Sequence, residues 1–270
     1  SKTILLDDNV QPMGPSAEFL KFSIGSVSSD KILEKVYYDD DLPARAAVLE
    51  SYNSGLEITR IQRAFSIGIM GLKRKRRLVP TRWSITAVDS IISLYLLNNM
   101  VKKYPLINEY RVFEITKFGN RFIILMIPSA WMYELIEAWY PGTLWNPDTQ
   151  NIAICGDWET YKGRQTYAQI GGCYYASRLA VSEYLFREKR QAAVLVLREA
   201  YSSYLLPIGV WLVRECVREA LSMGYVKFNT LQEALEYISK RLKIKIEVWK
   251  KNSSLLRFLR KQENLIRYLV

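Results

Sequence analysis

The segment Lys73-Arg-Lys-Arg-Arg-Leu-Val-Pro-Thr-Arg-Trp-Ser-Ile-Thr-Ala-Val-Asp89 joins five consecutive cations to the start of an apolar helix. Val79-Pro80 keeps the backbone between the two parts extended, because a proline disfavours the helical conformation of the residue before it. Ser84 or Thr86 is then placed to cap a helix that runs to residue 103. The segment therefore predicts a cationic strip beside the positive end of a helix dipole, where anions are stabilised.

The side chains of this strip suit a nucleic acid. Lysine and arginine bind phosphate, and an arginine next to a tryptophan adds a surface for stacking. The alternative is a solvated basic loop ahead of a core helix, since charge runs usually face water. The residues predicted to contact nucleic acid here are Lys73, Arg74, Lys75, Arg76, Arg77, Arg82 and Trp83.

A second group of basic residues accompanies a helix predicted over residues 174–190. Tyr174 and Tyr175 lie at its start, and basic side chains interleaved with aromatic ones suit backbone tracking with base stacking. The alternative is an ordinary helix end, because cations are favoured at any helix C-terminus. The predicted nucleic-acid contacts in this region are Arg164, Arg178, Arg187, Lys189 and Arg190.

Residues 79–89 resemble the signature of the archaeal Nre proteins, a family linked to DNA repair. Further segments resemble that family in the same order, between about residues 10 and 220: Pro12-Met-Gly-Pro15, residues 39–44, Gly163-Arg164, Gly171-Gly172 with Tyr174-Tyr175, residues 190–192, and Gly209-Val-Trp211 with Val213-Arg-Glu215. The resemblance implies a role in DNA repair and DNA rather than RNA as the partner. Family members carry an N-terminal region with clustered cysteines that has no counterpart here. We therefore expect this chain to be part of a longer protein.

Composition excludes several kinds of chemistry within the 270 residues. The chain has no histidine, which excludes Ser-His-Asp and Cys-His catalysis and histidine ligation of a metal. Its three cysteines, Cys155, Cys173 and Cys216, form no C-x-x-C pair. This spacing argues against a self-contained metal site and against a disulfide framework. With neither a signal peptide nor an apolar span of 18 residues expected, we predict a cytoplasmic protein without a membrane partner.

The net charge of +11 is unevenly distributed. Residues 1–50 hold nine acids and five bases, whereas residues 239–270 hold ten bases and two acids. Basic segments in a basic chain indicate a polyanionic partner, because phosphates that the protein neutralises release their counterions.

Hydrophobic periodicity predicts an α+β fold, an antiparallel meander packed with several helices. The predicted strands cover residues 32–38, 110–116, 122–127, 131–139, 192–197 and 244–248, with a helix as the alternative for residues 131–139. The predicted helices cover residues 43–52, 59–66, 86–103, 174–190 and 210–221, with a further helix from the capping box at Thr230. The first thirty residues read as an extended arm. We expect one globular region over residues 1–260, with a sub-boundary near residue 105 as an alternative, and a C-terminal tail over residues 261–270.

A weak catalytic candidate lies in the polar segment of residues 157–167. Asp157 and Glu159 are two residues apart, so on a strand they share a face, as paired metal ligands do. Glu134 and Glu137 are alternative acids. The competing interpretation is a polar surface loop, and no catalytic residue is assigned.

The last nine residues resemble the box by which proteins bind the sliding clamp PCNA. In that box a glutamine is followed three residues later by an aliphatic residue and then by two bulky residues, here Gln262, Leu265, Tyr268 and Leu269. One helical turn puts the last three on a common face, where they can enter an apolar pocket. The alternative is an amphipathic helix end packed on its own core.

These observations lead to three hypotheses. The first is a DNA repair factor that binds nucleic acid and is recruited to the sliding clamp by the C-terminal box. The second is a nuclease or other hydrolase acting on nucleic acid with a divalent metal as cofactor. The third is an adaptor without catalytic activity that links the clamp to other repair proteins.

Overall fold

The computed structural model describes residues 30–143, 145–204 and 209–269, with side chains described as far as Gln262. The extended arm expected over the N-terminal residues lies outside this part of the chain. At the centre is a sheet with the strand order β4-β3-β5-β2-β1-β6. Its strands are β1 (Tyr110–Lys117), β2 (Asn120–Ile127), β3 (Met132–Trp139), β4 (Ala153–Glu159), β5 (Ala193–Ala200) and β6 (Val226–Phe228).

The sheet is mixed because β5 lies between β2 and β3. It pairs antiparallel to β2 and parallel to β3, whereas the predicted hairpin of β1 and β2 is antiparallel throughout. Every residue of β5 is buried, as expected for a central strand with a nearly continuous apolar sequence. The α+β class is confirmed, and the strand order departs from a continuous meander where β5 returns to the middle of the sheet.

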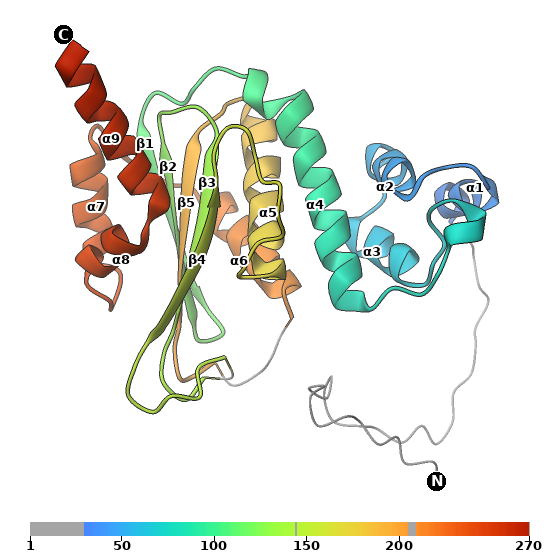
Figure 1. The fold of residues 1–270 in the computed structure, drawn as a ribbon, viewed down its shortest axis with the longest axis horizontal. Helices are drawn as coiled ribbons and strands as arrows, with labels where there is room; N and C mark the ends of the chain where they lie inside the picture. The colour runs from blue at the N-terminus through green and yellow to red at the C-terminus, as the bar shows by residue number, and fades with distance from the viewer. Residues whose placement is uncertain (1–29, 144, 205–208, 270) are drawn as a thin grey trace.

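Helices cover both faces of the sheet (Figure 1). Adjacent residues of β2 serve opposite cores, since Phe122 belongs to the cluster on one face and Ile123 to the cluster on the other. The first face is covered by α5 (Gly172–Glu188) and α6 (Trp211–Ser222), and the second by α7 (Leu231–Ser239), α8 (Ile246–Asn252) and α9 (Ser254–Leu269).

A further helical layer lies outside α5 (Figure 1). It consists of α1 (Lys31–Tyr38), α2 (Ala44–Asn53), α3 (Ile58–Ser66) and α4 (Thr81–Asn99), with the short 3-10 turns η1 (Lys73–Lys75) and η2 (Val101–Lys103). Ile61, Ile92 and Leu96 are buried in its core together with Leu179 of α5. The layer therefore shares its core with the helices that cover the sheet.

The segment Thr81–Lys103, which covers α4 and η2, is long and apolar enough to cross a membrane by length and composition alone. We expected no such segment from the sequence. Its fold explains the apolar character, because 56% of its most apolar window is buried and the helix lies between α3 and α5. It is therefore built like the core helix of a globular domain.

Two predicted strands are wrong. Residues 32–38 form α1, in which Ile32, Leu33 and Val36 lie on one side and the Asp30 carboxylate accepts a hydrogen bond from the Ile32 N–H (3.0 Å). Residues 244–248 lead into α8, which buries Trp249 completely. Both segments are short, and an apolar run of this length does not distinguish a strand from a helix.

The helix after the cationic strip begins earlier than predicted. Pro80 occupies the N-cap position of α4, and Ser84 and Thr86 lie inside the helix rather than at its start. The Thr86 hydroxyl donates a hydrogen bond to the Arg82 carbonyl (3.0 Å). The predicted helices corresponding to α2, α3, α5, α6 and α7 are confirmed, including the capping box of α7 at Thr230.

Candidate nucleic-acid interface

Helices α4 and α5 run side by side in the same direction. Near their starts, Thr86 lies so close to Gly172 that a Cβ atom at position 172 would be 2.8 Å from the Thr86 Oγ1. Farther along, the Arg178 Nε donates a hydrogen bond to the Ser93 Oγ (3.2 Å). The residue numbers of the contacts rise together in both helices, so the N-terminal ends of α4 and α5 lie at the same end.

Helix α6 runs in the same direction as α5. Val210, immediately before α6, would be 2.9 Å from a Cβ atom at Gly172, and Arg218 of α6 pairs with Glu183 of α5 at 2.8 Å. The starts of all three helices therefore converge. This convergence explains Gly172, because any side chain at this position would collide with both neighbours, whereas Gly171 is required by its positive φ.

This end of the molecule is electrostatically suited to anions. Within the described residues, no side chain caps the N-terminus of α4, α5 or α6, and none of the three has an acidic residue in its first turn. The free N–H groups of a helix start carry partial positive charge, which stabilises a phosphate nearby. The partial positive charges of three helix starts add up at this end.

The cationic strip precedes the start of α4, and only part of its charge is free. Lys73 pairs with Asp40 (2.7 Å), and the guanidinium of Arg76 donates hydrogen bonds to the Tyr37 carbonyl (2.6 Å) and the Asp39 carbonyl (2.7 Å) at the end of α1. These two residues hold the strip against α1. Within the described part of the chain, the exposed side chains without a hydrogen bond or ion pair in this strip are Arg74, Lys75 and Arg77.

Two exposed aromatic rings lie beside the helix starts. Trp83 of α4 is 46% exposed, and Tyr167, just before α5, is 49% exposed. Their ring centroids are 5.8 Å apart, and the guanidinium carbon of Arg82 lies 5.6 Å from the centroid of Trp83. Arg82, Trp83 and Tyr167 thus lie together at the helix starts, and the segment that leads into α4 carries Arg74, Lys75 and Arg77. We call these six residues together the N-terminal interface.

Asp157 and Arg164 shape the loop that carries Tyr167. Their side chains form an ion pair, and the guanidinium also donates to the carbonyls of Thr166 (3.2 Å) and Tyr167 (3.3 Å). The second carboxylate oxygen of Asp157 accepts the Gln169 N–H (2.7 Å). Arg164 is thus not a free phosphate clamp, and Asp157 is not a free metal ligand.

Arg178 and Glu159 form a buried ion pair beneath this loop. The Arg178 Nη1 lies 2.8 Å from the Glu159 carboxylate, which also accepts a hydrogen bond from the indole of Trp131 (3.1 Å). Both charged side chains are at most 2% exposed. The predicted contact of Arg178 with nucleic acid does not fit this position, because reaching the surface would break the pair and leave Glu159 buried alone.

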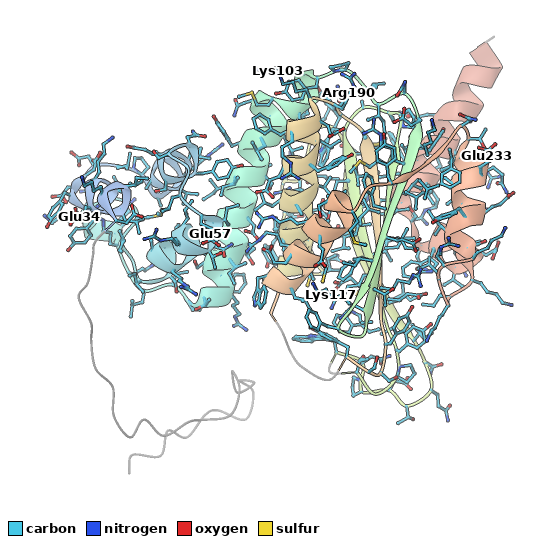
Figure 2. The ribbon with its side chains drawn as sticks, turned by 180° about the vertical axis from the view of Figure 1, so that it is seen from behind. Glu34, Glu57, Lys103, Lys117, Arg190 and Glu233 are labelled. Atoms are coloured by element: carbon cyan, nitrogen blue, oxygen red, sulfur yellow. The ribbon has the colours of Figure 1, made fainter. Side chains whose placement is uncertain are left out.

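The remaining basic residues of the second group, Arg187, Lys189 and Arg190, are exposed at the other end of α5. There the Gln191 side chain donates to the Lys102 carbonyl at the end of α4 (3.2 Å). Figure 2 shows Lys103 and Arg190 close together at this end. With 17 residues, α5 is about 25 Å long. Arg187, Lys189 and Arg190 are therefore separated from the predicted contacts before α4 by the length of α5.

The described residues bring no three His, Cys, Asp or Glu side chains together as a metal ion would require. Asp157 and Glu159 do lie on one face of β4, as predicted, but each faces an arginine that supplies the positive charge a metal would bring. Cys216 is buried, and burial raises the pKa of its thiol to about 11. The site residues present therefore do not fit a divalent cation at this pair.

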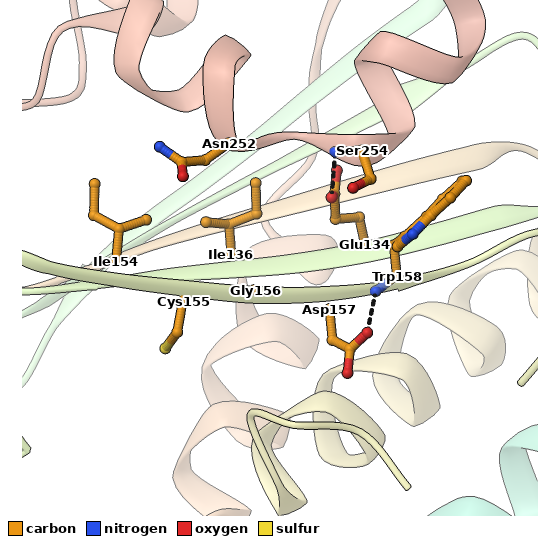
Figure 3. A pocket seen from close by; sticks show the side chains of 9 residues that line it. All are labelled: Glu134, Ile136, Ile154, Cys155, Gly156, Asp157, Trp158, Asn252 and Ser254. Carbon is orange, nitrogen blue, oxygen red and sulfur yellow. Dashed lines mark hydrogen bonds between the residues drawn. The ribbon is translucent and has the colours of Figure 1, made fainter. Parts of the chain in front are cut away.

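Glu134, the alternative acid, holds the start of α9. Its carboxylate accepts hydrogen bonds from the Ser253 hydroxyl and from the backbone N–H of Ser254 (2.7 Å) and Leu255 (3.2 Å). It lines a pocket of about 190 Å³ between β3, β4 and the junction of α8 and α9 (Figure 3). Glu137 is likewise engaged, since it pairs with buried Arg198 (2.7 Å). Both acids are therefore engaged in contacts within the fold.

The C-terminal box continues α9, whose backbone is helical from Ser254 to Leu269. Gln262 is exposed. The side chains of Leu265, Tyr268 and Leu269 lie outside the described part. In Figure 1, α9 extends past the sheet toward the C-terminus.

Tyr167 was not predicted as part of the interface. It lies four residues before the Gly171-Gly172 pair quoted for the family resemblance, and this proximity was the available signal. Its position next to Trp83 depends on the contact between α4 and α5, which joins residues more than eighty positions apart. No local pattern reveals such a contact.

The fold and the interface define a class: an α+β protein with an exposed surface of cations and aromatic rings at converging helix starts. The chain belongs to the archaeal Nre family. The model of the family's N-terminal region ("Archaeal Nre, N-terminal") matches residues 1–146, and that of its C-terminal region ("Archaeal Nre, C-terminal") matches residues 159–268. The interval between the two matches, residues 147–158, follows β3 and contains all of β4 except its last residue.

Three curated relatives carry names that refer to DNA repair. The chain is 44% identical to DNA repair protein NreB of Archaeoglobus fulgidus, over 93% of the chain and 63% of that relative. It is 39% identical to DNA repair protein NreA of the same organism, over 91% and 62%, and 34% identical to DNA repair protein NreA of Haloferax volcanii, over 92% and 60%. The chain thus spans about three fifths of these relatives. They support an archaeal origin and a role in DNA repair. No solved structure matches the chain.

Proposed function

We propose that this chain is a DNA repair factor that binds nucleic acid at the N-terminal interface and is recruited to the sliding clamp by its C-terminal box. The observation that carries the first part is the position of Arg74, Lys75 and Arg77. These exposed cations lie on the segment that leads into α4, whose start converges with those of α5 and α6. The names of the relatives support DNA as the polyanion.

The interface combines two favourable terms for a phosphate backbone. Mobile cationic side chains release counterions from the nucleic acid, and the helix starts add fixed partial charges that need no reorganisation. Arg76 and Lys73 contribute differently, because their side chains are engaged with α1 and Asp40. Binding is therefore expected to depend on three of the five consecutive cations.

Charge reversal tests this assignment. Replacing Arg74, Lys75 and Arg77 by Glu should weaken binding of a labelled duplex and flatten its dependence on salt. On duplex DNA each lost phosphate contact changes the slope of log affinity against log salt by about 0.9. A matched control reverses three exposed lysines on the far side of the sheet, Lys240, Lys250 and Lys251.

The control should change affinity and slope much less than the interface variant, although both alter the net charge equally. If the two triple variants weaken binding to the same extent, the binding is not localised at the N-terminal interface. If neither the native protein nor the variants bind nucleic acid in a salt-dependent way, the proposal fails as a whole.

Recruitment by the clamp is supported by the sequence of the box and by its place at the end of a helix. The helical backbone of α9 is the conformation in which residues 265, 268 and 269 share one face. Arg257, Arg260 and Lys261, which precede the box, are exposed and can steer the tail toward an acidic partner.

A further inference from the structure

The N-terminal interface exposes aromatic rings, which the binding of a phosphate backbone does not require. Trp83 and Tyr167 each expose nearly half of their surface, although both contact another ring. Behind them, Tyr175 lies 5.3 Å from Tyr167 with an angle of 31° between the ring planes, and Tyr175 itself is 7% exposed. A chain of rings thus leads from the surface into the core.

The loop that carries Tyr167 is fixed from three sides. The Ala168 N–H donates to the Tyr175 hydroxyl (2.9 Å), and Arg164 donates to the Tyr167 carbonyl (3.3 Å). Asp157 in turn holds the Arg164 guanidinium and the Gln169 N–H. These contacts, of which the bond from Ala168 to Tyr175 is buried, hold the loop of the exposed ring in place, so that stacking on it costs little additional ordering.

We propose that the N-terminal interface recognises unpaired bases of single-stranded DNA by stacking on Trp83 and Tyr167. This inference rests on the proposed function and names the form of DNA that the same surface takes. The cations hold the backbone of the strand while its bases lie against the rings. Asp157 and Arg164 are positioning residues, because they orient the loop of Tyr167 without facing the ligand.

The choice of an unpaired strand follows from where the rings lie. Bases of an intact duplex are stacked on one another and present only their edges and the backbone, so exposed rings add little to duplex binding. An unpaired base has a free face, and every base can stack on an aromatic ring whatever its identity. The surface therefore favours single strands without sequence preference.

The test compares a labelled 20-nucleotide oligothymidylate with a 20-base-pair duplex by fluorescence anisotropy. Trp83→Ala and Tyr167→Leu should each weaken binding of the single strand about fivefold or more, which corresponds to the loss of one stacked base. Duplex affinity and the salt slope for the single strand should change little, because no phosphate contact is lost. Trp83→Phe should restore most of the affinity.

Tyr161 provides a matched control. It is 47% exposed and has a cation beside its ring, with the Lys102 Nζ 5.1 Å from the centroid, but it lies at the opposite end of α4. Tyr161→Leu should leave single-strand affinity unchanged. Equal losses in the Tyr161 and Tyr167 variants, or an unchanged ratio of single-strand to duplex affinity in the Trp83 and Tyr167 variants, would overturn the stacking site.

The two proposals fail in different ways. If the charge-reversal variant loses duplex binding while the aromatic variants bind single strands normally, the interface binds nucleic acid but not through stacking. If the native protein shows no salt-dependent binding to either form of DNA, both the proposed function and this inference are wrong.

Discussion

Arg214 of α6 donates two hydrogen bonds from its Nη1 to the carboxylate of Asp89 in α4, at 2.7 and 3.0 Å, and both residues are buried. Gln62 of α3 donates a third bond to the same carboxylate (2.7 Å). Three helices are thus joined at one acid. Burial raises the pKa of Asp89 to about 6, although the charge of Arg214 acts in the opposite direction.

The buried group of Asp89, Arg214 and Gln62 is called the joint of the three helices. Removing the cation from this joint should make the free energy of unfolding strongly dependent on pH. In Arg214→Met, Asp89 loses the cation that is hydrogen-bonded to it, and its pKa in the folded protein rises further. A carboxyl group whose folded pKa exceeds its unfolded pKa stabilises the fold at low pH and loses that contribution as the pH rises through the folded pKa. We expect a loss of about 3–5 kcal/mol at pH 8 and a smaller loss at pH 5, measured by urea unfolding.

The double variant Asp89→Asn with Arg214→Met is the control for this prediction. It has no titratable group at the joint, so its free energy of unfolding should vary less between pH 5 and pH 8 than that of Arg214→Met. Equal pH dependence in the two variants would show that another group is responsible.

Arg76 and Arg74 should have opposite roles, although they are two residues apart. Arg76→Ala removes hydrogen bonds to carbonyls at the end of α1 and should lower the free energy of unfolding by about 2–3 kcal/mol, without weakening nucleic-acid binding by the folded protein. Arg74→Ala should change stability by less than about 0.5 kcal/mol and weaken binding. Thermal unfolding and anisotropy together test both. Weaker binding by folded Arg76→Ala would contradict its structural role.

Glu134→Gln should loosen the start of α9 selectively. Each carboxylate oxygen accepts one backbone N–H there, whereas an amide keeps only one acceptor oxygen and lacks the negative charge that favours a helix start. The expected cost is about 1–2 kcal/mol. Hydrogen exchange should accelerate about tenfold in residues 254–258 and remain unchanged in β5. A uniform acceleration would mean that Glu134 stabilises the whole fold instead.

Asp157→Asn separates the nuclease hypothesis from a structural role. Because Asp157 holds Arg164 and the Gln169 N–H, we expect a less stable protein with weaker single-strand binding. Labelled DNA incubated with Mg²⁺ or Mn²⁺ should give the same products with the native protein and the variant. Cleavage by the native protein that the variant lacks would restore Asp157 as a catalytic candidate.

Tyr268→Ala, or deletion of residues 262–270, should abolish binding to the sliding clamp and leave the fold and the affinity for DNA intact. The large apolar side chain is expected to fill the pocket of the clamp. Calorimetry with the purified clamp measures the loss. If the deletion variant still binds the clamp, the assignment of residues 262–270 as the clamp-binding box is wrong.

Local patterns predicted much of the fold. The β1–β2 hairpin follows from alternation around Phe118-Gly119, both of which adopt positive φ, and the capping box marks the start of α7. The continuous apolar run of β5 predicted a buried central strand. Each of these signals lies within a few residues, which is why sequence reasoning finds them.

The site could be predicted only in part, because its composition depends on distant contacts. The strip before α4 was found, but the distinction between Arg74 and Arg76 depends on the end of α1, nearly forty residues earlier. The burial of Arg178 depends on Glu159 and on Ser93 of α4. A cation is free or engaged according to its spatial neighbours, which the spacing of charges along the chain does not reveal.

The position of β5 has a consequence for how the two regions of the family are inherited. β5 belongs to the C-terminal region, yet both of its neighbours in the sheet, β2 and β3, belong to the N-terminal region. Alone, the first region would have a gap where its central strand belongs, and the second would expose that strand with both edges open to aggregation. The two regions are thus halves of one interlocked unit. Neither half can be exchanged between proteins by itself, and two fragments cut near residue 150 should regain their fold only when they are refolded together.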